Sequence, residues 1–99
     1  MSLFDKEERY TPLAEAVEKM VFPICKSMHD AELANGATNR QAMARVVPAN
    51  PFKAATIRTS PALWGFSEEI RNAITQDDLD AIWIHAVVDI SISNILNIA

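Results

Sequence analysis

The chain has 99 residues, of which 49% are hydrophobic and 22% charged, and it carries a formal net charge of −4. It contains only two glycines, which favours helices over a turn-rich β architecture, and its length fits one domain with its own core. A single cysteine, Cys25, excludes an intrachain disulfide and a cysteine-based zinc site, and agrees with a reducing cytoplasm. We therefore expect one all-α domain over residues 1–99, without a cofactor.

Helix start signals recur along the chain. Three good capping residues each precede a proline, the preferred first helical residue, at Thr11, Asn50 and Ser60. Thr38 with Gln41, and likewise Thr75 with Asp78, have the spacing of a capping box, and Ser67 precedes two glutamates. These signals predict six helical segments: 12–34, 39–47, 51–58, 61–65, 68–74 and 76–97.

The first of these helices, 12–34, has an amphipathic pattern with one apolar stripe expected to face the core. The stripe consists of Leu13, Val17, Met20, Ile24 and Met28. Pro23 lies in the middle and should kink or split the helix, because proline removes a backbone hydrogen bond and its ring clashes with the preceding turn. Asn35 and Gly36 then supply a C-terminal stop.

The last helix, 76–97, is the most informative segment, since 13 of the 20 residues from Leu79 to Ile98 are apolar. A narrow polar strip interrupts its surface at Asp78, His85, Asp89 and Ser93. The alternation from Ile90 to Ser93 also resembles a strand, but the capping signal and the absence of glycine or proline favour a helix. Asp80, His85 and Asp89 interrupt the apolar run, so we do not expect a membrane span.

This helix has more apolar surface than one partner helix covers. Trp83, Val87 and Ile90 lie on one flank, and Val88, Ile92 and Ile95 lie on the other. A helix that is apolar around most of its circumference is either central in the core or part of an interface. Because covering one flank leaves the other in water, we expect a two-fold symmetric homodimer through this helix.

The charges are divided unevenly. Residues 1–32 carry four basic and seven acidic side chains, residues 33–67 carry four basic and no acidic ones, and residues 68–99 carry one basic and six acidic ones. The simplest interpretation is that the basic middle pairs with its acidic flanks. The alternative is an anion-binding face that associates with nucleic acid through segment 38–58. Its candidate residues are Arg40, Arg45, Lys53 and Arg58.

Aromatic residues gather around Trp64 and Phe66, with Gly65 between them. Large aromatic side chains anchor cores and interfaces, and this pair lies in a short connection where one member is expected to face a partner. Trp83 is expected in the core by its helix face, although an interface helix would also present it. The candidate partner-binding set is therefore Trp64, Phe66, Trp83, Val88, Ile92 and Ile95.

Evidence for catalysis is sparse. His85 and Asp89 are four apart and therefore neighbours on a helix, as a base with its orienting carboxylate or as two metal ligands. The sequence places no nucleophile or third ligand beside them, so a solvated polar strip is the simpler interpretation. His29, with Asp30 and Glu32, lies near the end of the first helix, where a histidine suits the helix dipole, and a structural role is the simpler interpretation there too. Cys25 is expected to be a buried small hydrophobe. An enzyme or metal-binding protein centred on His85 and Asp89 is the third hypothesis, and no metal is expected.

Together, these patterns predict a small helical bundle in which the first and last helices form the scaffold. The preferred function is a protein–protein interaction module, adaptor or regulatory, that homodimerises through its C-terminal helix and also binds a further protein.

Overall fold

Seven helical segments follow one another along residues 11–98, the part of the chain that the computed structural model describes, with side chains described for residues 11–96. In chain order they are α1 (Thr11–Ala34), α2 (Asn39–Val46), η3 (Val47–Ala49), α3 (Ala54–Ile57), η4 (Pro61–Leu63), α4 (Glu68–Asn72) and α5 (Gln76–Ile98), where η marks a 3₁₀ turn. No strand occurs in this range. The all-α prediction is confirmed, and the strand alternative for Ile90–Ser93 is wrong.

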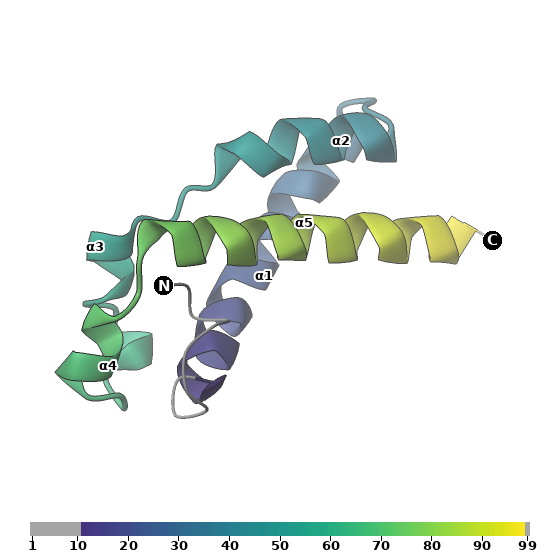
Figure 1. Ribbon diagram of the computed structural model, residues 1–99. Helices are drawn as coiled ribbons and strands as arrows, with labels where there is room; N and C mark the ends of the chain where they lie inside the picture. Colours follow the sequence, from purple (N-terminus) through teal and green to yellow (C-terminus); the bar gives the residue numbers. More distant parts are fainter. Residues whose placement is uncertain (1–10, 99) are drawn as a thin grey trace.

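Three helices, α1, α2 and α5, contact one another and form the scaffold. Helix α5 extends along the molecule, α1 crosses behind it, and α2 lies along one side of it (Figure 1). The short segments α3, η4 and α4 gather at the N-terminal end of α5 (Figure 1). The resulting shape is elongated, with extents of 43 × 23 × 21 Å, and one flank of α5 is buried while the other is exposed.

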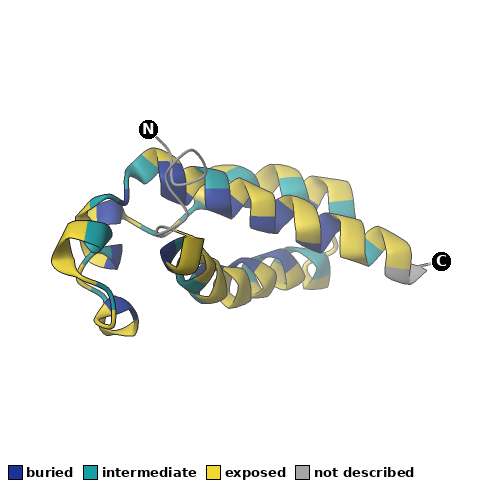
Figure 2. Ribbon diagram, turned by 60° about the horizontal axis from the view of Figure 1, so that its bottom comes forward, coloured by how far each residue is buried: buried dark blue, intermediate teal, exposed yellow. Residues whose placement is uncertain are grey.

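The core lies where these helices meet (Figure 2). Trp83 is its largest fully buried side chain. The Trp83 indole Nε1 donates a hydrogen bond of 2.7 Å to the Val46 carbonyl at the end of α2, and Phe52 packs against its ring at a centroid distance of 6.0 Å. Burial of the large apolar ring and pairing of its one polar atom both stabilise the junction of α2 with α5.

The predicted capping boxes are confirmed. Thr38 and Gln41 exchange side-chain-to-backbone hydrogen bonds at the start of α2. Thr75 and Asp78 do the same at the start of α5, at 2.9 and 3.1 Å. Ser67 caps α4 through its side-chain oxygen, which accepts from the Ile70 amide. Each box satisfies backbone N–H groups that have no partner inside the helix.

The apolar stripe predicted on α1 is wrong in its second half. The buried residues of α1 are Leu13, Val17, Val21, Cys25 and His29, each four after the last. Ile24 is 45% exposed, and Met20 and Met28 are only partly buried. A row with spacing of four runs at an angle to the helix axis, and such an inclined row is what a crossing helix covers. Cys25 is buried as predicted.

Pro23 does not split the first helix, because α1 is continuous from Thr11 to Ala34. Pro23 is exposed, so water can solvate the Lys19 carbonyl that loses its backbone partner. The predicted split is wrong, and the predicted kink stays a prediction.

The segment predicted at 51–58 forms a helix only from Ala54 to Ile57, with Lys53 as its N-cap. Asn50 serves another purpose than capping: its side-chain oxygen accepts from the Phe52 amide at 3.0 Å, and its nitrogen donates to Asp80 at 2.8 Å. The Ala54 amide instead donates to the Gln76 side chain at 2.9 Å. The helix therefore begins three residues later than predicted, where its first amide is hydrogen-bonded to the start of α5.

Candidate interaction surface

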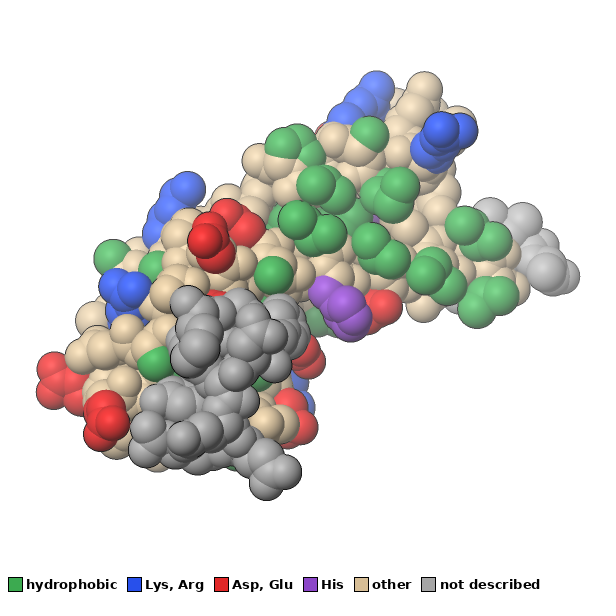
Figure 3. Space-filling model, viewed as in Figure 1, with side chains coloured by type: hydrophobic (Ala, Val, Ile, Leu, Met, Phe, Trp, Pro, Cys, Tyr) green, Lys and Arg blue, Asp and Glu red, His purple; other side chains and the backbone are tan. Residues whose placement is uncertain are grey.

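A row of aliphatic side chains along α5 faces solvent. Ile84, Val88, Ile92 and Ile95 are spaced by four, four and three residues, and are 45%, 38%, 50% and 60% exposed. We call these four residues the α5 row. The opposite flank, with Trp83, Val87 and Ile90, is buried. Figure 3 shows hydrophobic side chains gathered over α5 and α2 on this face of the molecule.

Between α2 and α5, the row borders a groove of about 450 Å³. Met43 of α2 and Val88, Ile92 and Ile95 of α5 supply its apolar lining. Arg40 also lines it and provides a positive charge at the α2 side. A concave apolar surface with one charged side chain is suited to receiving apolar side chains from another molecule.

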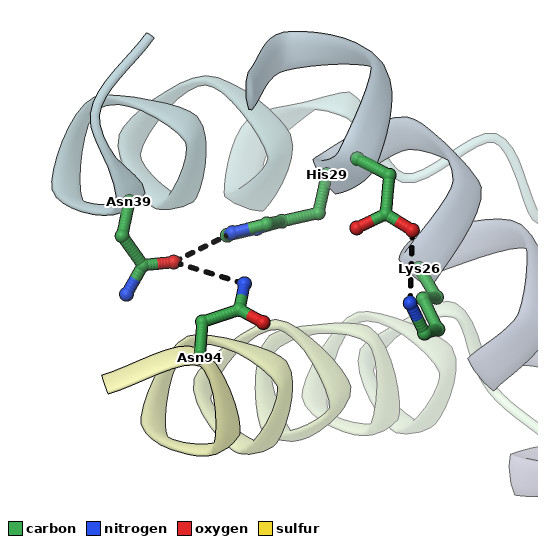
Figure 4. A network of polar contacts seen from close by, with 5 residues as sticks. Lys26, His29, Asn39 and Asn94 are labelled. Carbon is green, nitrogen blue, oxygen red and sulfur yellow. Dashed lines mark hydrogen bonds and ion pairs between the residues drawn. The ribbon is translucent and has the colours of Figure 1, made fainter. Parts of the chain in front are cut away.

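A polar cluster fixes the two helices that form this groove (Figure 4). Asn39 Oδ1 accepts from His29 Nε2 of α1 at 2.8 Å and from Asn94 Nδ2 of α5 at 3.2 Å, while Asn39 Nδ2 donates to the Ser91 carbonyl at 2.9 Å. Since the amide oxygen only accepts, Nε2 is the protonated nitrogen of His29. The Asn39 side chain therefore binds α1, α2 and α5 together below the groove.

The six predicted partner-binding residues lie in different environments. Val88, Ile92 and Ile95 are exposed together on α5, but Trp83 is fully buried and has no surface to offer a partner. Trp64 is 67% exposed, and its Nε1 donates to the Thr59 carbonyl at 3.2 Å. Phe66 is half-buried and packs against the core. Trp64 and Phe66 belong to the region of η4 and α4, away from the C-terminal end of α5 (Figure 1).

Sequence reasoning missed two members of the exposed apolar surface, Ile84 and the 69%-exposed Leu96. Both follow from the spacing of four, because Ile84 precedes Val88 by four residues and Leu96 follows Ile92 by four. Extending the predicted flank by one turn in each direction would have found them.

The four basic candidates do not form one surface patch with a shared role. Arg45 pairs with Glu32 at 3.2 Å, as the interpretation of basic middle with acidic flanks predicts. Arg58 is partly buried and donates through Nε to the Ile74 carbonyl at 2.8 Å, with a second guanidinium nitrogen on the same oxygen. Arg40 and Lys53 are exposed. Arg45 and Arg58 are therefore both paired with other groups of the same chain, and nucleic-acid binding stays a prediction.

His85 and Asp89 are in contact on the surface of α5. His85 Nδ1 lies 3.4 Å from Asp89 Oδ2, and the two side chains are 68% and 55% exposed. The residues for which the structure gives a description contain no group of three or more metal-ligating side chains. Asp78, predicted on the same polar strip, is instead fully buried, and its carboxylate accepts from the Thr75 amide in the capping box of α5. An exposed pair of this kind contributes little to stability and fits a solvated strip.

Cys25 lies in the core between the buried residues of α1. Burial raises the pKa of its thiol from 9.0 to about 11, because the charged thiolate loses its hydration. The thiolate is the reactive form, so this side chain is chemically inert at neutral pH.

No known protein family matches this chain, and no curated protein or solved structure is significantly similar to it. Length and composition do distinguish one helix: residues Gln76–Leu96 of α5 are long and apolar enough to cross a membrane. The same properties occur in core helices, and the flank of α5 that contains Trp83 is buried in the core.

Proposed function

We propose that this chain is a small protein–protein interaction module that homodimerises through α5. The observation that carries the proposal is the α5 row, four aliphatic side chains that the described part of the monomer leaves 38–60% exposed on one helix face. A contiguous apolar patch of this kind is typical of an interaction site, whereas isolated exposed aliphatic residues are common on any surface.

The energetics favour a second copy as the occupant. Full burial of a large aliphatic side chain contributes about 1.5–3 kcal/mol, so covering the exposed half of four of them contributes about 3–6 kcal/mol per copy. A homodimer gains this contribution twice, against an association cost of about 4 kcal/mol or more. The balance is about 2–8 kcal/mol, and its upper half, about 5–8 kcal/mol, corresponds to a dissociation constant of about 1–200 µM.

The surface that contains the α5 row is also preorganised for association. The capping box at Thr75 and Asp78 fixes the start of α5, and the Asn39 cluster fixes its second half against α2 and α1. Because the row is part of a helix held at both ends, little conformational entropy is lost when a partner covers it. Trp64 would remain exposed in such a dimer, which leaves it as the candidate contact for a different protein.

Sedimentation velocity from about 1 to 200 µM tests the proposal. We expect the wild-type chain to change from monomer to dimer over this range, and Ile92→Glu and Ile95→Glu to remain monomeric. Ile24→Glu is the matched control, because Ile24 is an exposed isoleucine of α1 outside the groove and its substitution should leave the dimer intact.

A wild-type monomer at 200 µM would contradict the proposal. Flotation of that monomer with lipid vesicles, lost in Ile92→Glu, would assign the α5 row to a membrane surface instead.

A further inference from the structure

The face that contains the α5 row has opposite charges at its two ends. Asp77 and Asp80 lie in the first turns of α5, before the row begins. Arg40 lines the groove beside Ile92 and Ile95, at the far end of the row. Figure 3 shows Lys and Arg side chains near the start of α2, and beyond the hydrophobic area, toward the start of α5, it shows acidic side chains with Lys and Arg side chains beside them. Lys53 lines one hollow together with Asp80 and Ile84, so Asp77 and Asp80 outnumber the basic charge at this end by two to one.

Asp80 and Arg40 lie on the same side of the row and at similar distances from its centre. Asp80 faces the α2 side, since its carboxylate accepts from Asn50, which follows η3. Asp80 precedes Val88 by eight residues, which is about 12 Å along the helix. Ile95, which lines the groove together with Arg40, follows Val88 by seven residues, which is about 10 Å. A two-fold axis that passes by Val88, perpendicular to α5, therefore brings Asp80 of one copy to the position of Arg40 of the other.

We propose that two copies pack antiparallel about this axis, with Arg40 of each facing the partner's Asp80. The inference rests on the proposed homodimer and specifies its geometry. In this arrangement Val88 meets the partner's Val88. Ile84 lies against the partner's Ile92 and enters the groove between the partner's α2 and α5. The groove of each copy thereby covers the α5 row of the other, so the same contact is made twice, as an isologous interface requires.

A parallel arrangement is disfavoured by the same charges. It would place Asp77 and Asp80 of one copy beside those of the other, and like charges across an interface repel. It would also align the two macrodipoles of α5, which oppose each other favourably when the helices are antiparallel. Both effects select the antiparallel geometry.

Cysteine cross-linking distinguishes the two geometries. Ile84→Cys and Ile92→Cys chains are mixed, and disulfide formation under mild oxidation is followed on non-reducing gels. In the antiparallel dimer, residue 84 faces the partner's residue 92, whereas the two copies of residue 84 lie about 12 Å apart, too far for a disulfide. We expect the mixture to cross-link at least tenfold faster than either variant alone. Cys25 is left unsubstituted in these variants, because it is buried. The wild-type chain, in which Cys25 is the single cysteine, is the control for cross-linking through this residue.

Val88→Cys should cross-link to itself in either geometry and serves as the positive control for dimerisation. Faster cross-linking of Ile84→Cys alone than of the mixture would overturn the antiparallel inference and leave the homodimer standing. A dimer in sedimentation without a cross-link at Val88→Cys would place the interface elsewhere and would also overturn it. A monomer in sedimentation together with no cross-link in any variant would overturn the proposed function as well.

Charge reversal tests the pairing of Arg40 with Asp80. Arg40→Asp and Asp80→Arg should each weaken dimerisation about tenfold, because each creates two like-charge contacts per dimer. The double variant should recover to within about threefold of the wild-type dissociation constant. Asp80→Arg also removes the contact with Asn50, so circular dichroism is used to check that each variant folds. A double variant that dimerises no better than the weaker single variant would contradict the pairing.

Discussion

His29 of α1 and Asn39 of α2 are joined by a hydrogen bond of 2.8 Å between Nε2 and Oδ1, although His29 is completely buried. The same Asn39 amide contacts α5 at Asn94 and at the Ser91 carbonyl. Buried polar groups are costly unless they are paired, so a single side chain that satisfies partners on two other helices specifies how the three pack. The groove that the α5 row borders depends on this arrangement.

Asn39→Ala should therefore lower the free energy of unfolding by about 2–4 kcal/mol, because it leaves the buried His29 Nε2 without its acceptor. Urea denaturation followed by circular dichroism measures the change. Asn72→Ala, at an exposed position of α4, is the matched control and should stay within about 0.5 kcal/mol of the wild type. A loss below that value at Asn39 would show that the cluster does not stabilise the fold.

The two tryptophans should behave oppositely. Trp83→Phe removes the buried hydrogen bond to the Val46 carbonyl and leaves unfilled volume, so we expect a loss of about 2–3 kcal/mol. Trp64→Phe, at a 67% exposed position, should cost less than about 1 kcal/mol. Fluorescence provides an independent measurement. The Trp64→Phe chain, which retains Trp83, should emit at shorter wavelength and resist acrylamide quenching. Equal quenching of the two variants would place Trp83 at the surface.

Local signals in the sequence predicted the helices well, because capping involves residues only three positions apart. The boxes at Thr38 and Thr75 are both present, and α5 begins within one residue of the expected position. Asn50 failed as a helix start because its side chain has a partner, Asp80, thirty residues away. A contact at that separation leaves no local pattern.

The prediction of which apolar row of α1 is buried was wrong for a related reason. Two adjacent rows of α1 are apolar, and the row with Ile24 and Met28 is more hydrophobic than the row with Cys25 and His29. Only the crossing of α5 decides which row is covered. On α5, by contrast, the sequence predicted two apolar flanks that cannot both be covered, and the structure buries the one with Trp83 and leaves the one with Val88 exposed.

The Cys25 thiol should be unreactive in the folded protein. Burial raises its pKa to about 11, and the side chain has no exposed surface, so labelling by a disulfide reagent at pH 8 should be at least a hundredfold slower than in urea. Rapid labelling of the native chain would contradict the buried position.

The same pKa shift predicts a pH dependence of stability. Between pH 9.0 and about 11 the thiol is ionised in the unfolded chain but still protonated in the folded one. Folding therefore takes up a proton, and the stabilisation, complete below pH 9, declines as the pH rises through this range. Cys25→Ala removes the thiol, so its unfolding free energy should fall less steeply than that of the wild type over the same interval. Parallel curves for the two chains would show that the thiol does not titrate in this way.

Arg58 is predicted to act in stability rather than in anion binding. Its guanidinium contacts the Ile74 carbonyl through two nitrogens, and its own carbonyl accepts from Arg71 Nη1 at 3.0 Å, which links the segment of α3 to the start of α5. Hydrogen bonds from charged groups contribute about 1.5–3 kcal/mol, so Arg58→Ala should lower the unfolding free energy by that amount. The matched control is Lys53→Ala, because Lys53 is exposed and its loss should cost less than about 0.5 kcal/mol. A gel shift with nucleic acid at low salt is measured on both variants. If the wild-type chain retards nucleic acid and Arg58→Ala abolishes the shift without a change in stability, Arg58 belongs to an anion-binding surface and this prediction is wrong.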